Sequence, residues 1–111
     1  KAEKLKNLFN NIKIVDWGED LDPNMIINAT SVGLNKNDKL NLEFAKLKNT
    51  EFFYDIIYNP NETNFLRTAI KLGKKSENGK KMFIYQAAQS FKIWHLIEPE
   101  INNEVYGLLD T

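Results

Sequence analysis

Two short apolar runs, at residues 25–29 and 52–57, most strongly limit the fold that this chain can adopt. The first reads Met-Ile-Ile-Asn-Ala and the second reads Phe-Phe-Tyr-Asp-Ile-Ile. Runs of this length that are apolar on both faces of an extended chain are typical of buried strands in a parallel sheet. The first run leads into a loop, residues 30–34, at the end of the strand where open α/β sheets bind their ligands.

Helical spacing of apolar residues predicts the remaining elements. We expect helices at residues 2–9, 42–47, 64–72, from about 82 to 97, and 100–109. Thr63 is a suitable N-cap, Gly73 a suitable stop, and Pro99 a suitable first residue for the last helix. The β-branched residues at 12–15 favour a further short strand, and we expect one helical turn around Glu19 and Leu21. Residues 74–81 read as a polar loop.

This order of elements corresponds to one flank of a doubly wound α/β sheet. The sheet is short of strands, and the glycine-rich G-x-G-x-x-G turn of a complete dinucleotide-binding unit does not occur in the sequence. The chain also begins without methionine, inside a helical pattern. We therefore expect a fragment with at least one unprotected sheet edge, and we expect the isolated chain to self-associate.

The helix after residue 81 is apolar almost all round, and its spacing predicts a buried face formed by Phe83, Ala87, Phe91 and Trp94. Gln86 stands out in this setting, because a buried amide without a partner costs about 1–3 kcal/mol. From periodicity alone, a structural glutamine bonded to neighbouring backbone is the favoured interpretation. Asp55, at the end of the second apolar run, is likewise better explained as fixing loop backbone than as a general base.

Composition excludes several classes of function. Fifteen basic and fifteen acidic residues cancel, so no overall field attracts nucleic acid or an anionic membrane. The chain has no cysteine and one histidine, which excludes thiol chemistry and thiolate metal sites, argues against a metal centre, and suits the cytoplasm. No apolar run approaches the roughly 20 residues that span a bilayer.

Three motifs follow one another along the chain. Residues 26–34 read Ile-Ile-Asn-Ala-Thr-Ser-Val-Gly-Leu, residues 54–60 read Tyr-Asp-Ile-Ile-Tyr-Asn-Pro, and residues 79–88 contain Gly-Lys-Lys-Met and Gln-Ala-Ala. In this order and at this spacing, they resemble the C-terminal part of the shikimate dehydrogenase family over nearly the whole chain. The resemblance implies an oxidoreductase that interconverts 3-dehydroshikimate and shikimate with NADP as cofactor, in aromatic amino-acid biosynthesis.

The resemblance also implies a two-domain enzyme with its active site in the cleft between the domains. Residues 1–111 would then be the C-terminal portion of the Rossmann-like NADP-binding domain, with its closing C-terminal helices. The first strands, the glycine-rich turn and the N-terminal substrate domain would lie upstream. The family's catalytic lysine and aspartate belong to that upstream domain, so the chain alone is expected to be inactive.

Two residues match substrate-binding positions of the family. Tyr58, the second tyrosine of Tyr-Asp-Ile-Ile-Tyr, corresponds to the tyrosine that reaches the substrate, and a phenol can hydrogen-bond a carboxylate or a ring hydroxyl. Gln86, in Gln-Ala-Ala, corresponds to the glutamine that offers its amide to the substrate's hydroxyls. For Gln86 the resemblance outweighs the structural interpretation.

Four further positions correspond to the cofactor site. The main chain at Ile56 would meet the nicotinamide end, and Gly79 would allow backbone to approach the flat ring. Met82 and Thr30 would line the same cleft. Two alternatives stay open: a quinate/shikimate dehydrogenase that prefers NAD, since the loop that reads the 2′-phosphate would lie upstream, and a non-catalytic Rossmann-like binding module.

Overall fold

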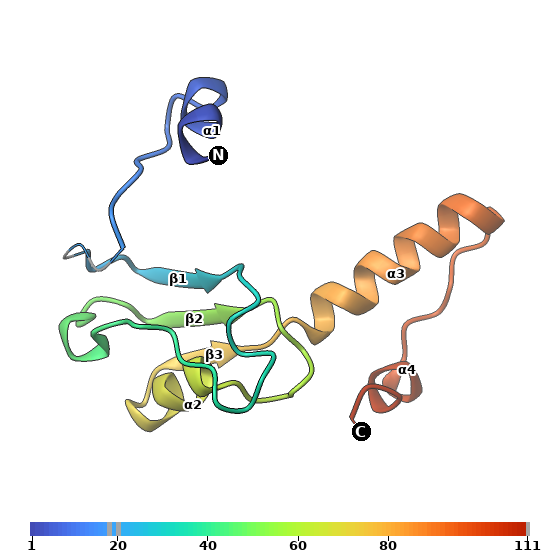
Figure 1. Ribbon diagram of the computed structural model, residues 1–111. Helices are drawn as coiled ribbons and strands as arrows, with labels where there is room; N and C mark the ends of the chain where they lie inside the picture. The colour runs from blue at the N-terminus through green and yellow to red at the C-terminus, as the bar shows by residue number, and fades with distance from the viewer. Residues whose placement is uncertain (18, 20, 111) are drawn as a thin grey trace.

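The computed structural model describes residues 1–17, 19 and 21–110, and its helices and strands form an α/β arrangement (Figure 1). The elements are α1 (Ala2–Leu8), β1 (Met25–Asn28), the 3-10 helix η1 (Phe44–Lys46), β2 (Phe52–Asp55), α2 (Asn64–Lys71), β3 (Lys75–Glu77), α3 (Lys80–His95) and α4 (Asn103–Gly107). The strands form one parallel sheet in the order β1-β2-β3. The predicted fold class is therefore confirmed.

Both apolar runs form strands, and they pair with each other in parallel. Met25 lies opposite Phe52, and Asn28 lies opposite Asp55. Phe53 on β2 is 1% exposed and meets the ring of Phe65 on α2 edge-on, with 5.6 Å between ring centroids. This face of the sheet carries the core, which is completed by Leu47, Leu66 and Ala69.

The opposite face of the sheet lacks such a cover within the described residues. Met25 and Ile27 alternate along β1 with Ile26 and Asn28, and they are 42% and 54% exposed. Parallel sheets normally have helices on both faces. Among the described residues, the predicted burial of both faces of the sheet is therefore confirmed only for the face that α2 covers. In addition, one edge of β1 is free among the described strands.

Local signals placed α2 correctly. The Thr63 side chain accepts a hydrogen bond from the Leu66 N–H and so caps the helix N-terminus. Gly73 follows the helix with φ +70, a left-handed conformation that glycine adopts without strain. Because both signals are properties of neighbouring residues, they need no tertiary information.

Other predicted elements differ from the structure. Residues 12–15 form no strand, because no neighbouring strand pairs with them and β-branched residues alone do not make one. The polar segment 74–81 contains β3, which pairs with β2 at Phe53 and Ser76. The last helix begins after Asn102, whose side chain caps it, so it is shorter than predicted. The turn expected near Glu19 falls partly outside the described residues.

The molecule is extended, because two of its helices project from the sheet (Figure 1). Its radius of gyration is 16.7 Å, against about 13 Å for a compact domain of this length. α1 stands apart on an extended linker, and α3 runs away from the end of β3. None of the described helices is long and apolar enough to cross a membrane.

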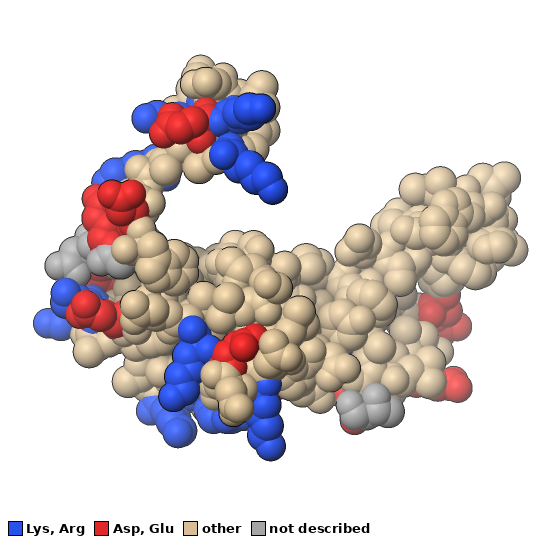
Figure 2. Space-filling model, in the orientation of Figure 1, with Lys and Arg blue, Asp and Glu red and all other residues tan. Residues whose placement is uncertain are grey.

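The predicted burial of α3 is wrong. Phe83, Phe91 and Trp94 are 38%, 42% and 76% exposed, and Ile84 is the buried residue of the helix. In Figure 2, α3 presents an uncharged surface, whereas Lys and Arg side chains gather below the sheet. The periodicity therefore identified an apolar helix correctly, but the described residues do not supply the surface that would cover it.

Candidate functional site

The buried carboxylate of Asp55 joins three elements at the carboxyl ends of the strands. Its Oδ1 accepts hydrogen bonds from Asn28 Nδ2 at 3.1 Å and from the Ile57 N–H at 3.0 Å. Its Oδ2 accepts from the Thr63 hydroxyl at 2.6 Å. The side chain thus ties the end of β1, the loop after β2 and the start of α2 together, which confirms the interpretation that Asp55 fixes loop backbone.

Thr30 lies in the loop after β1, where the sequence placed it. Its N–H and its hydroxyl donate to Asn28 Oδ1 at 3.1 and 2.7 Å, and its Oγ1 accepts from the Val32 N–H at 3.1 Å. Gly33 follows with φ +119, and a Cβ there would come within 3.2 Å of Ile57 and Thr63. The loop is therefore closely packed against the segment that follows β2.

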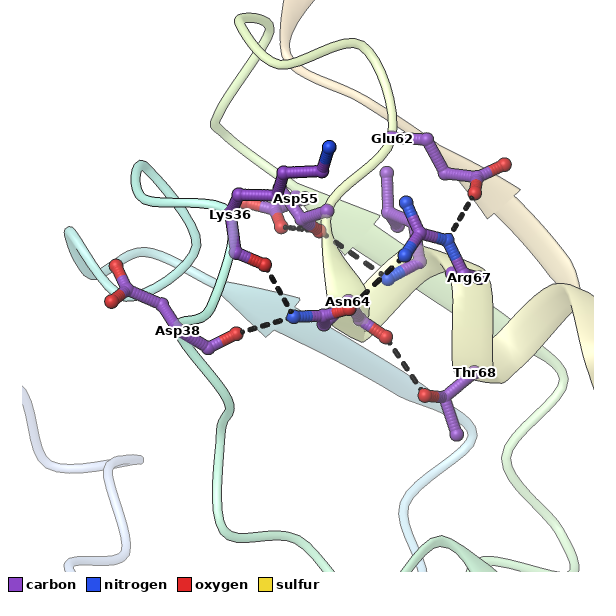
Figure 3. Close-up of polar contacts among 9 residues, drawn as sticks. Lys36, Asp38, Asp55, Glu62, Asn64, Arg67 and Thr68 are labelled. Carbon is purple, nitrogen blue, oxygen red and sulfur yellow. Dashed lines mark hydrogen bonds and ion pairs between the residues drawn. The ribbon is translucent and has the colours of Figure 1, made fainter.

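Asn64, the first residue of α2, holds the next part of this loop (Figure 3). Its Nδ2 donates to the carbonyl oxygens of Lys36 and Asp38 at 3.0 and 2.9 Å. Arg67 donates to the Asn64 side chain and pairs with Glu62 at 2.8 Å.

Hydrogen bonds from the backbone N–H groups of residues 35 and 33 hold the pKa of Asp38 below its usual value. A polar cavity of about 360 Å³ lies at this edge.

Ile56 and Gly79, both predicted cofactor contacts, lie against each other. A Cβ on Gly79 would stand 1.9 Å from the Ile56 carbonyl oxygen and 2.4 Å from its carbonyl carbon. The Gly79 N–H donates to the Ile57 carbonyl at 3.1 Å, and the Ile56 N–H donates to the Asn28 carbonyl at 3.1 Å. Glycine is thus required at 79 for the approach of two backbone segments, without reference to a flat ring.

Tyr58 and Gln86, the two predicted substrate contacts, both lie next to Phe83. The Tyr58 ring stacks on the Phe83 ring, with 4.5 Å between centroids and 27° between planes. Gln86 follows Phe83 by one turn of α3 and is exposed, so it is not the buried structural glutamine that periodicity favoured. Phe83 and Gln86 line a groove of about 470 Å³ along the helix, together with Ser90 and Trp94.

The structure therefore joins the predicted residues into two groups. Ile56 touches Gly79, and Tyr58 meets the helix turn that carries Gln86. Within the described part of the chain, hydrogen bonds link Thr30 to Ile56 through Asn28, and Met82 is 42% exposed on the first turn of α3. Sequence reasoning missed Asn28 and Phe83. The signal for Asn28 was present, since a polar residue there interrupts an apolar run at the end of a strand.

Comparison with known proteins identifies the family. No family model matches the chain. The chain is 54% identical, over its full length and 42% of the relative's, to a protein of Pelagibacter ubique named shikimate dehydrogenase (NADP(+)). Its structure is also similar to the crystal structure of a chorismate mutase/shikimate 5-dehydrogenase fusion protein from Clostridium acetobutylicum. The match covers 99% of this chain and 42% of that one, at 31% identity and a TM-score of 0.83.

A second solved structure, of a shikimate dehydrogenase in complex with NADP+, is 40% identical over 81% of this chain and 32% of that one, with a TM-score of 0.69. The parallel sheet and its helices are thus the Rossmann-like arrangement found in these proteins. The chain spans about two fifths of the length of the relatives that it matches. By sequence and by fold, the chain belongs to the shikimate dehydrogenase family.

Proposed function

We propose that this chain is the C-terminal portion of the NADP-binding domain of a shikimate dehydrogenase, a cytoplasmic enzyme that reduces 3-dehydroshikimate to shikimate with NADPH. The observation that carries the proposal is that the chain is 54% identical, over its full length, to a relative named for this activity. The upstream part of such a protein would provide the glycine-rich turn, the remaining strands, the substrate domain and the catalytic lysine and aspartate.

The uncovered surfaces of the chain support this division. α3 is apolar and largely exposed, and β1 has a free edge and an exposed apolar face among the described residues. Surfaces of this kind are normally covered in a soluble protein. The proposal is that the upstream part of the complete protein covers them and thereby forms the active-site cleft beside the carboxyl ends of the strands.

For substrate binding we propose Tyr58 and Gln86. The Tyr58 hydroxyl makes no hydrogen bond to any of the described residues. The Gln86 amide is exposed in the groove. A primary amide that lines the groove, and a phenol stacked on Phe83 at its edge, suit a ligand that carries a carboxylate and several hydroxyls, because together they offer both donors and acceptors. Shikimate and 3-dehydroshikimate are such ligands.

For cofactor binding we propose the main chain at Ile56, with Gly79, Met82 and Thr30 nearby. The described residues donate no hydrogen bond to the Ile56 carbonyl oxygen, which is held against Gly79 at the end of the sheet. It can therefore accept a hydrogen bond from an amide group such as that of a nicotinamide. Bound NADPH would supply the hydride, while these residues hold the ring and limit its contact with water.

The test uses a chimera in which this chain replaces the matching 42% of the Pelagibacter ubique relative. We expect the chimera to reduce 3-dehydroshikimate with NADPH, and the isolated chain to show no such activity. Tyr58→Phe and Gln86→Ala should each raise the KM for shikimate by about tenfold, the effect of one lost hydrogen bond of about 1.4 kcal/mol. The KM for NADP should stay unchanged.

Gln89→Ala is the matched control, because Gln89 is an exposed glutamine on the same helix outside the groove. An unchanged KM for shikimate in the Tyr58 and Gln86 variants would refute the substrate assignment. A preference for NAD would favour the quinate/shikimate dehydrogenase alternative. A folded chimera that binds NADP without reducing 3-dehydroshikimate would favour the binding module.

We also propose that the isolated chain self-associates through β1. Met25 and Ile27 are exposed beside the free strand edge, and such an edge is a template for pairing with another chain. Sedimentation equilibrium should show a mass that increases with concentration, and Ile27→Lys should shift the distribution toward the monomer. A monomer at every concentration would contradict the proposal.

A further inference from the structure

The stacked pair formed by Tyr58 and Phe83 connects the loop after β2 to the first turn of α3. The two rings lie with centroids 4.5 Å apart and planes 27° apart, which is close to the offset stacked geometry that aromatic side chains favour. Tyr58 is half-buried and Phe83 is 38% exposed. The contact therefore lies at the surface of the groove that Gln86 also lines.

The main chain of Phe83 is anchored in the first turn of α3, next to the end of the sheet. Its N–H donates to the Gly79 carbonyl at 2.9 Å, and Gly79 is buried against the Ile56 backbone. Tyr58, in contrast, sits in a loop, and its hydroxyl makes no hydrogen bond within the described part of the chain. Within the described part of the chain, the stack on Phe83 is therefore the ring contact that the Tyr58 side chain makes.

We infer that Phe83 is a positioning residue, which holds the Tyr58 ring so that its hydroxyl meets the substrate beside Gln86. The inference rests on the proposed function, because it takes Tyr58 as a substrate contact. Without the stacked ring, Tyr58 would sample other side-chain rotamers, and substrate binding would have to select one of them. Phe83 thus acts on the substrate through Tyr58 rather than by touching it.

The expected kinetic effect is selective. In the chimera, Phe83→Ala should raise the KM for shikimate by about fivefold, the range expected for loss of one stacked aromatic pair, and leave the KM for NADP unchanged. Phe83→Tyr keeps the ring and should restore the original KM. Tyr85→Ala is the matched control, because Tyr85 is an exposed aromatic residue on the same helix outside the groove, and its KM for shikimate should be that of the unsubstituted chimera.

A double-mutant cycle separates positioning from direct contact. In a Tyr58→Ala background, Phe83→Ala should cause no further rise in the KM for shikimate, because the ring that it positions is gone. A further rise of the same fivefold size would mean that Phe83 touches the substrate itself, and would overturn the inference. Failure of Phe83→Tyr to restore the KM would overturn it as well.

A second measurement does not depend on activity. With ¹³C-labelled tyrosine in the chimera, the Tyr58 ring signals, assigned by their loss in Tyr58→Phe, should shift when Phe83→Ala removes the ring current of the stacked partner. Unchanged signals would overturn the inference even in an active enzyme. A shift in a chimera without dehydrogenase activity would instead keep the ring contact and reject the proposed function.

Discussion

Replacing Asp55 by alanine is expected to lower the free energy of unfolding of the chain by about 3 kcal/mol. The carboxylate is fully buried and accepts hydrogen bonds from Asn28 Nδ2, the Ile57 N–H and the Thr63 hydroxyl. Alanine would leave the Ile57 N–H and the Thr63 hydroxyl buried without this acceptor, whereas Asn28 Nδ2 would keep its second bond, to the Val32 carbonyl. Each buried group that loses its partner costs about 1–3 kcal/mol unless water or a local shift relieves it. Urea-unfolding midpoints at one fixed protein concentration measure the change, since fixed concentration removes the effect of self-association.

Two variants make this prediction specific. Asp55→Asn keeps the oxygen that faces Asn28 and Ile57 and places an amide opposite the Thr63 hydroxyl, which can turn to accept, so the loss should be near 1 kcal/mol. Asp22→Ala also removes three hydrogen bonds, all to Asn49. Because Asp22 is exposed, water replaces it, and the midpoint should change little. Equal losses for Asp22→Ala and Asp55→Ala would show that burial of the carboxylate is not what matters.

The parts of the fold that could be predicted depend on neighbouring residues alone. The apolar runs at residues 25–29 and 52–57 identified β1 and β2, and Thr63 and Gly73 set the ends of α2. β3 could not be found in this way, because Lys75, Ser76 and Glu77 have no strand-like pattern. Its extended form comes from pairing with β2, which is a tertiary interaction.

Burial was harder to predict than helix position. Periodicity located each end of α3 to within about two residues, but it treated Phe83, Phe91 and Trp94 as buried when all three are exposed. The spacing of apolar residues indicates which side of a helix must be covered. The residues that cover it can lie elsewhere in the sequence or in another part of the protein. Exposed apolar residues are informative for this reason, since they mark where a partner surface is missing.

The candidate site was predictable only through family resemblance. Helical spacing places Gln86 one turn after Phe83, but nothing in the sequence indicates that Tyr58 meets Phe83, because that contact joins a loop to a helix more than twenty residues away. The Asn28–Asp55 pair, in contrast, follows from strand register once the two strands are known to be parallel neighbours. Local polarity at strand ends was therefore a usable signal, while aromatic stacking across loops was not.

Gly79→Ala is expected to destabilise the chain by about 3 kcal/mol, whether or not a cofactor is present. The added Cβ would lie 1.9 Å from the Ile56 carbonyl oxygen, so one of two backbone segments must move. Movement would break the hydrogen bond from the Gly79 N–H to the Ile57 carbonyl and loosen the start of α3. The urea-unfolding midpoint measures the loss in the absence of nucleotide.

Gly107→Ala is the matched control, because a Cβ at Gly107 in α4 would meet no atom within 4 Å. Alanine there should leave the midpoint unchanged or raise it slightly, since it reduces the freedom of the unfolded chain. The two explanations for glycine at 79 then give opposite results. If close approach to a nicotinamide ring were the reason, Gly79→Ala would keep its midpoint and raise only the KM for NADP in the chimera. If contact with Ile56 is the reason, stability falls without any ligand, and α3 carries Met82, Phe83 and Gln86 away from the end of the sheet together.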